Sequence, residues 1–296
     1  MSTTSRIGVC GIGRMGAAIA QRLLLLGHPV SVWNRTRTKA EAISGASVAA
    51  TAADLARDCD VIISIMTDDK ALEDAYRGAN GLLAGAAPGK LFIEMSTVLP
   101  NTEIALAGEA EAKGARFVDS PVGGTVGPAR DGKLFAFVGG SEAAFGEAKP
   151  LLDQLCRRVE HLGPVGSGSL MKLAINLPLL VFWQTFGEAL ALVKPLGLSP
   201  QRLIDIFGDT SGAPATLRTR GPAIIANLGG DNSAPVTIHI DGVRKDLRTM
   251  VAEAATRGVT LPVTARALQV FDEVSAEGMG EADVVNLPAY WRDAGR

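Results

Sequence analysis

The chain has little of several things that would point to particular classes of protein. Its 29 Lys and Arg nearly balance its 31 Asp and Glu, and a net charge of −2 gives no electrostatic case for binding nucleic acid or a membrane. The three cysteines lack the spacing of a metal site or a CxxC pair, and no His, Cys and Asp cluster has metal-ligand spacing. We therefore expect buried or incidental thiols in a reducing compartment, and no metal.

Long apolar runs are also scarce. The most apolar stretch, residues 177–183, is far too short to span a bilayer. Residues 1–6 run straight into an expected strand, so we expect no signal peptide. We expect a cytoplasmic enzyme or binding protein that acts on a small molecule, in about two domains of roughly 150 residues each.

The first half of the chain alternates strand and helix patterns. Short apolar runs typical of buried parallel strands are separated in several places by helical segments such as 102–113. The expected strands are 6–10, 30–33, 61–66, 91–95, 116–119 and 134–138. This alternation predicts an α/β fold with a doubly wound sheet, whose ligand lies at the carboxyl ends of the strands.

The alternation stops near the glycine-rich segment 163–168, which we interpret as a linker. Long helical patterns follow it, at 169–196, 199–208, 241–257 and 262–277. We predict a dinucleotide-binding Rossmann domain at 1–164 and an all-α domain for substrate binding and dimerisation at 165–296.

A glycine motif joins the first expected strand to the first helix. Its glycines suit a tight turn, a close backbone approach to a pyrophosphate, and packing of helix on strand. The helix N-terminus adds a partial positive charge. The strand, turn, helix and strand follow each other within about thirty residues, the context that such a motif requires. The residues are Gly11, Ile12, Gly13, Arg14, Met15 and Gly16.

The end of the second strand indicates which dinucleotide is bound. An NAD enzyme usually places Asp or Glu there for the ribose 2′-hydroxyl, whereas this chain has Asn34, Arg35 and Thr36. Arg35 can bind a 2′-phosphate, Thr36 offers a hydroxyl, and Lys39 lies one turn further on. We predict NADP(H) as the cofactor, in preference to NAD(H).

Lys172 and Asn176 lie four residues apart in the first long helix of the second half. This spacing is about one helical turn, so both side chains project from one face. A helix start is an unfavourable place for a surface lysine, which favours a functional role for Lys172.

With these motifs, the sequence resembles the β-hydroxyacid dehydrogenase family, which includes 3-hydroxyisobutyrate dehydrogenases and the tartronate-semialdehyde, glyoxylate/succinic-semialdehyde and sulfolactaldehyde reductases. The resemblance covers nearly the whole chain. It implies a Rossmann domain followed by an all-α domain, an active site between them, and homodimers or homotetramers. The matching segments are 11–16, 27–28, 34–36, 96–97, 119–124, 166–173, Asn176 and 245–247.

The resemblance also implies roles for single residues. Lys172 would protonate the developing alkoxide during reduction, after desolvation and a nearby nicotinamide cation have lowered its pKa. Asn176 would hold the substrate oxygen or orient the ammonium group. The implied cofactor contacts are Met66, Thr67, Thr97 and, from the second domain, Lys245.

Two departures from the family pattern concern the substrate. Gly123 replaces a serine that binds the substrate carboxylate, and Ile175 replaces an asparagine. The backbone of Gly123 and Gly124 could form an anion nest, and Thr125 could supply the missing hydroxyl. The leading hypothesis is reduction or oxidation of a small β-hydroxyacid or its aldehyde. Imine reduction and a non-catalytic NADP-binding module are the alternatives.

Overall fold

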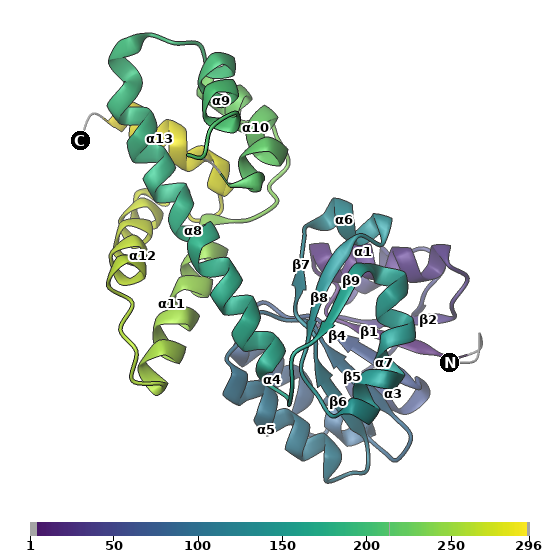
Figure 1. Ribbon diagram of the computed structural model, residues 1–296. Coiled ribbons are helices and arrows are strands. Elements are labelled where there is room, and N and C mark those ends of the chain that lie inside the picture. The colour runs from purple at the N-terminus through teal and green to yellow at the C-terminus, as the bar shows by residue number, and fades with distance from the viewer. Residues whose placement is uncertain (1–4, 213, 295–296) are drawn as a thin grey trace. The chain divides into compact units, whose positions relative to one another are not determined.

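The structure, a computed structural model, describes residues 5–212 and 214–294. The chain divides into two compact units, Met1–Leu173 and Ala174–Arg296, with an α/β first unit and a helical second unit (Figure 1). The predicted fold class is confirmed. The two units divide between Leu173 and Ala174, inside one long helix. The boundary predicted from the sequence lies earlier, in the glycine-rich segment 163–168.

The first unit contains a six-stranded parallel sheet in the order β3-β2-β1-β4-β5-β6. Most of its strands are short runs of apolar residues because helices cover both faces. The strand order reverses between β1 and β4, where a ligand is expected at the carboxyl ends. The strands are β1 (Ile7–Cys10), β2 (Val30–Trp33), β3 (Ser47–Val48), β4 (Val61–Ser64), β5 (Leu91–Glu94) and β6 (Arg116–Asp119).

Helices pack on both faces of this sheet and make two hydrophobic clusters. One face carries α1 (Arg14–Leu25), α2 (Arg37–Glu41), α6 (Val126–Asp131) and α7 (Glu142–Leu155). The other carries α3 (Ala52–Asp58), α4 (Asp69–Tyr76), the 3₁₀ turn η1 (Leu82–Gly85) and α5 (Pro100–Glu111). Both layers leave the carboxyl ends of the strands to the connecting loops.

The prediction that 134–138 belongs to the main sheet was wrong. This run forms β8 (Leu134–Val138) in a separate three-stranded sheet, antiparallel to β7 (Val122–Gly123) and parallel to β9 (Cys156–His161). Its apolar composition indicates burial, but composition alone does not identify the neighbouring strand. The sequence did not predict β7, which is very short, or β9, which is largely polar.

The long helix α8 (Ser167–Val193) confirms the helix predicted at 169–196, and the short 3₁₀ turn η2 (Lys194–Leu196) continues it. By length and composition, the span Ser167–Leu196 could cross a membrane, and 44% of its most apolar window is buried. The apolar stretch 177–183, which is too short by itself to span a bilayer, is only one part of this span. The core helix of a soluble protein meets the same criterion.

The remaining elements of the second unit are helical. The predicted helices correspond to α9 (Pro200–Gly208), α11 (Ile240–Thr256) and α12 (Pro262–Val274), the last followed by a π-helical turn at Ser275–Met279. The sequence did not predict α10 (Ala215–Leu228), which contains Pro222, the turn η4 (Val284–Asn286), or α13 (Leu287–Ala294).

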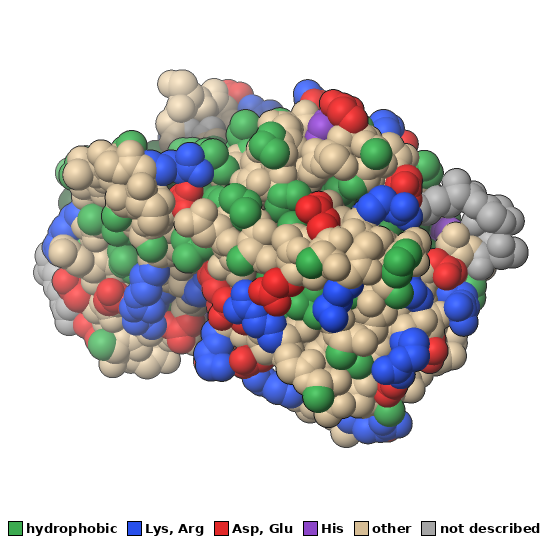
Figure 2. Space-filling view, turned by 90° about the horizontal axis from the view of Figure 1, so that it is seen from below, with side chains coloured by type: hydrophobic (Ala, Val, Ile, Leu, Met, Phe, Trp, Pro, Cys, Tyr) green, Lys and Arg blue, Asp and Glu red, His purple; other side chains and the backbone are tan. Residues whose placement is uncertain are grey.

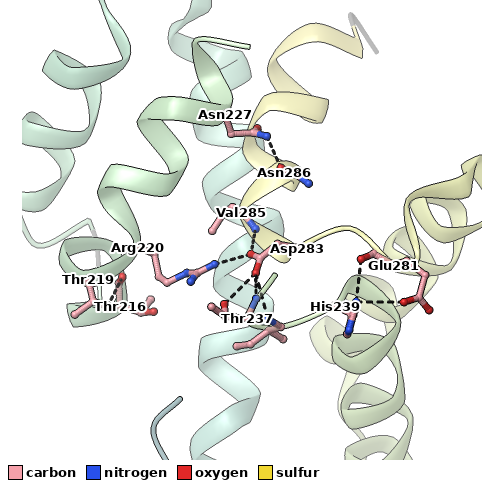
Figure 3. Close-up of polar contacts among 11 residues, drawn as sticks. Thr216, Thr219, Arg220, Asn227, Thr237, His239, Glu281, Asp283, Val285 and Asn286 are labelled. Atoms are coloured by element: carbon pink, nitrogen blue, oxygen red, sulfur yellow. Dashed lines mark hydrogen bonds and ion pairs between the residues drawn. The ribbon is translucent and has the colours of Figure 1, made fainter. Parts of the chain in front are cut away.

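Asp283 joins three segments of the helical unit (Figure 3). Its carboxylate accepts hydrogen bonds from the Arg220 guanidinium at 2.6 Å, the Thr237 N–H at 2.6 Å and the Val285 N–H at 2.9 Å. Burial alone would raise the pKa of Asp283, but these N–H groups and the Arg220 charge outweigh it and hold the pKa below its usual value. These partners therefore keep the buried Asp283 carboxyl group in its charged form.

Candidate active site

The glycine motif forms a tight turn between β1 and α1. Gly11 has a φ of +99°, and a Cβ there would lie 2.2 Å from the Ile65 carbonyl oxygen. A Cβ on Gly16 would lie 2.0 Å from the Gly11 carbonyl oxygen, whereas one on Gly13 would meet nothing within 4 Å. The first and third glycines are therefore required by packing, and the second leaves open space before α1.

The start of α1 suits a phosphate group. Its N-cap residue Gly13 provides no side-chain cap, and its first turn contains no acidic residue. Unpaired N–H groups at such a helix start attract anions. The Asn34 side-chain oxygen accepts a hydrogen bond from the Ile12 N–H at 3.0 Å, so the end of β2 is tied to the glycine turn. The residues present fit a dinucleotide.

Cations gather where β2 and β4 end. Arg35, Thr36 and Lys39 are exposed, and Thr36 begins α2 without using its hydroxyl as a cap. Lys70, in the first turn of α4, was missed by the sequence prediction. Its hydrogen bond to Asp74 raises the pKa of Lys70, while the Arg35 charge acts in the opposite direction.

The loop after β4 is held by the loop after β5. The Met66 N–H donates to the Ser96 hydroxyl oxygen at 2.7 Å. Ser96 in turn donates from its N–H to Glu94 at 2.8 Å and from its hydroxyl to the same carboxyl group. Thr67, next to Met66, is exposed, and Thr97, next to Ser96, is half-buried. These predicted contact residues therefore lie at the carboxyl edge of the sheet.

The first turn of α8 is attached to the same edge. Asp119, the last residue of β6, accepts hydrogen bonds from the Gly166 N–H and the Ser169 N–H, both at 2.8 Å. Burial raises the pKa of Asp119, although these N–H groups partly offset it. Lys172 follows Ser169 by three residues and is half-buried. Asp119 therefore fixes where the helix that carries Lys172 begins.

Asn176 belongs to a polar cluster of the second unit. Its side-chain amide donates to Asp246 Oδ2 at 3.4 Å, and Asp246 Oδ1 lies 2.5 Å from the Lys245 Nζ. Asn176 is 7% exposed, and both partners come from α11. The structure thus brings Asn176, Asp246 and Lys245 together, whereas the expected contact of Lys245 with a cofactor stays a prediction.

The predicted substrate residues lie between β7 and α6. Gly124 has a φ of +124°, and a Cβ there would lie 2.9 Å from Leu134, so this position requires glycine. Gly123 is the last residue of β7. Thr125 is the N-cap residue of α6, but its hydroxyl makes no capping hydrogen bond to that helix. Ile175, which replaces an asparagine of the family pattern, lies on α8 and is 42% exposed.

A cavity of about 690 Å³ lies within the helical unit, but none of the predicted site residues line it. Its walls come from Asn227, Asn232, Asn286 and residues 277–279, among others. The groups predicted to act in chemistry instead lie on the strand ends and on α8. Among the residues that the structure describes, no group of three His, Cys, Asp or Glu could hold a metal.

Family models match both halves of the chain. Residues 6–163 match the NAD-binding domain of 6-phosphogluconate dehydrogenase. Residues 166–291 match the NAD-binding domain of NADP-dependent 3-hydroxyisobutyrate dehydrogenase. Glyoxylate/succinic semialdehyde reductase 1 of Arabidopsis thaliana is 33% identical over 279 residues, which cover 94% of this chain and 95% of that protein.

Solved structures agree with these matches. The 3-hydroxyisobutyrate dehydrogenase of Mycobacterium tuberculosis with L-serine is 26% identical, with a TM-score of 0.85 and coverage of 98% of this chain and 99% of that one. Psf3 in complex with NADP+ and 2-OPP is 28% identical, with a TM-score of 0.85 and coverage of 97% and 99%. A reductive aminase of Aspergillus terreus with NADPH is more distant, at 25% identity, a TM-score of 0.63 and coverage of 98% and 100%.

Proposed function

Because the chain belongs to the β-hydroxyacid dehydrogenase family, whose members are NAD(P)-dependent dehydrogenases and reductases, we propose that it uses NADP(H) to interconvert a small hydroxyacid and its aldehyde or keto form. Lys172 is the proposed general acid and base. A nicotinamide bound at the strand ends would supply or accept the hydride at the reacting carbon. Lys172 protonates the oxygen of that carbon during reduction, and removes the hydroxyl proton during oxidation.

The observation that carries this proposal is the attachment of α8 to Asp119. The carboxyl edge of a parallel sheet is where a Rossmann domain binds its dinucleotide. Because Asp119 ends β6 at this edge and binds the N–H groups of Gly166 and Ser169, α8 starts there. Lys172 is one turn beyond Ser169. An ammonium group at this place can exchange a proton with a substrate held against the nicotinamide.

NADP(H) is favoured by the charges at the end of β2. Arg35 and Lys39 are exposed, and the Arg35 charge acts on Lys70. A 2′-phosphate near these cations gains charge-assisted hydrogen bonds, whereas the ribose of NAD(H) offers no such group. The position that would carry the Asp or Glu of an NAD enzyme holds Asn34, whose oxygen binds the glycine turn instead.

We propose that the substrate is a short aldehyde acid such as glyoxylate or succinic semialdehyde, because the relative from Arabidopsis thaliana is named for these compounds. The backbone N–H groups of the turn at Gly123 and Gly124 would bind its carboxylate in place of a serine hydroxyl. Ile175, an apolar residue where many family members have an asparagine, favours a substrate with a hydrocarbon chain over a more highly hydroxylated one.

The test is oxidation of NADPH and NADH, followed by absorbance, with glyoxylate, succinic semialdehyde, other short semialdehydes and a cyclic imine. We expect turnover of at least one aldehyde acid, with NADPH preferred to NADH. Turnover of the imine alone would support the alternative of an imine reductase. NADPH binding without turnover of any compound would refute the proposed reaction.

A further inference from the structure

A row of polar side chains crosses the main sheet at its carboxyl end. The last residues of four neighbouring strands are paired in register, and they are Cys10, Ser64, Glu94 and Asp119. All four are 0% exposed. Positions buried in a parallel sheet are ordinarily apolar, and a buried carboxylate without partners is costly. The acidic members of this row therefore need an explanation.

Glu103, on α5, is a third fully buried carboxyl group and lies beside this row. Its Oε1 accepts a hydrogen bond from the Ser169 hydroxyl at 3.4 Å. Its Oε2 is buried and receives no hydrogen bond from the residues that the structure describes. Glu103 shares a side-chain hydrogen bond with Glu94, and two carboxyl groups can be joined in this way only if one of them carries a proton.

The charges around the pair favour the proton on Glu103. Burial, together with the negative charges of Glu94 and Asp119, raises the pKa of Glu103 well above its usual value. Glu94 is also buried, but it accepts hydrogen bonds from the Ser96 N–H and hydroxyl as well as from Glu103. Such bonds stabilise the ionised form, so Glu94 is the acceptor of the pair.

The pair completes a continuous chain of hydrogen bonds. The Met66 N–H donates to the Ser96 hydroxyl, and Ser96 donates to Glu94. Glu103 shares a side-chain hydrogen bond with Glu94 and accepts one from the Ser169 hydroxyl. The chain therefore runs from the loop after β4 to the first turn of α8.

We propose that Glu94 and Glu103 are positioning residues, which share one proton and fix the cofactor loop at Met66 relative to the helix that carries Lys172. This assignment rests on the proposed function, because it gives the loop and the helix their roles. At pH 8 it makes the two acids unequal: Glu103 is a neutral donor and Glu94 an anionic acceptor. A buried pair that only fills space has no such asymmetry.

Two isosteric substitutions separate these possibilities. In Glu103→Gln, the amide N–H₂ still donates to Glu94, and the amide oxygen still accepts from Ser169. In Glu94→Gln, one acceptor oxygen becomes an N–H₂ group that faces other donors, so Ser96 loses part of its support. The matched control is Glu109→Gln, on the same helix α5, where the side chain is 42% exposed and paired with Arg77.

The experiment measures the dissociation constant of NADPH by fluorescence titration, with the thermal midpoint of each variant alongside. We expect Glu103→Gln and Glu109→Gln to stay within about twofold of the wild type, and Glu94→Gln to weaken binding at least tenfold. Equal effects of Glu94→Gln and Glu103→Gln, or the reverse order, would overturn the assignment. If Glu94→Gln does not fold, Ser96→Ala takes its place, and binding within twofold of the wild type would then contradict the proposed chain.

A second readout separates this inference from the proposed function. Infrared spectroscopy at about pH 8 should show the carbonyl band of a buried protonated carboxylic acid in the wild type and in Glu109→Gln. The band should be lost in Glu103→Gln. Its presence without NADPH binding would refute the proposed function and keep the shared proton, whereas its absence from the wild type would refute the shared proton itself.

Discussion

Asn176 donates a hydrogen bond from its side-chain amide to Asp246, a residue 70 positions later in the chain, at 3.4 Å. The other carboxylate oxygen of Asp246 pairs with Lys245 at 2.5 Å. Asp246 therefore fixes which end of the Asn176 amide points away from α11. In the proposed reaction we expect the Asn176 oxygen to bind the substrate or to orient the ammonium group of Lys172.

Exchanging the amide of Asn176 and the carboxylate of Asp246 tests whether their hydrogen bond supports catalysis. Asn176→Asp places a second carboxylate beside Asp246, and like charges repel, so we expect kcat/KM to fall at least tenfold, or about 1.4 kcal/mol. The double variant Asn176→Asp, Asp246→Asn restores one donor and one acceptor and should recover part of the loss. Asp205→Asn, on the exposed part of α9, is the control and should have no effect. If the double variant loses as much activation free energy, calculated from kcat/KM, as the two single variants together, the pairing of Asn176 with Asp246 would be contradicted.

The cofactor preference depends on Arg35. Arg35→Asp replaces a cation by an anion that repels a 2′-phosphate and can bind a ribose hydroxyl, so the ratio of kcat/KM for NADPH to that for NADH should reverse. Steady-state kinetics with both cofactors measure this ratio. Arg202→Asp, at an exposed position of α9, controls for the change in net charge. A ratio that Arg35→Asp leaves unchanged would remove Arg35 from the site.

Positive and negative side chains are interspersed on the face of the molecule shown in Figure 2, in keeping with the net charge of −2. Arg35 and Lys39 are exposed cations just beyond the end of β2. They lie at a strand end that fits a dinucleotide, and this position, rather than total charge, is what supports the assignment of a 2′-phosphate site.

Much of the first unit could be predicted because buried parallel strands are short apolar runs and the glycine motif marks the first turn. The partner of β8 could not be predicted, because an apolar run does not specify its neighbour. The helix spacing identified Lys172 and Asn176. The link from Asn176 to Asp246 and the meeting of Glu94 with Glu103 join separate elements, so local periodicity carries no signal for them. A single acid at the end of the apolar strand Leu91–Glu94 was the available clue.

Asp283 should contribute strongly to the stability of the helical unit. Asp283→Asn leaves the guanidinium of Arg220 without its charged partner, and breaking a buried pair in this way costs about 3–5 kcal/mol. The control Asp209→Asn, at an exposed helix end, should change the free energy of unfolding by less than about 0.5 kcal/mol. Because its pKa is lowered, the contribution of Asp283 is present at neutral pH and lost as the pH falls through the folded-state value.

The buried carboxyl groups should have the opposite dependence on pH. Burial raises the pKa of Glu94 to about 7 and that of Glu103 well above its usual value, so the folded state retains protons that the unfolded chain releases. The free energy of unfolding should therefore fall as the pH rises from about 5.5 to 8. Several other side chains form hydrogen bonds with Glu94 or Glu103 or interact with their charges. They are Ser64, Ser96, Cys10, Tyr76, Asp119 and Ser169.

Glu103→Gln removes one of these protons. Its slope of unfolding free energy against pH should be shallower than that of the wild type by about 1.4 kcal/mol per pH unit, whereas Glu109→Gln should retain the wild-type slope. Denaturant titrations at three pH values measure the slopes. Parallel curves for Glu103→Gln and the wild type would show that Glu103 does not carry a proton in the folded state.

The most direct test of the proposed chemistry compares Lys172→Ala with Lys113→Ala, an exposed lysine of the first unit. For each variant, kcat is measured with NADPH and the best aldehyde acid, and the dissociation constant of NADPH is measured separately. A general acid contributes roughly 10²-fold or more, so Lys172→Ala should lower kcat at least 10²-fold with nearly unchanged NADPH affinity, and Lys113→Ala should resemble the wild type. A near-normal kcat for Lys172→Ala would contradict the proton-transfer role of Lys172.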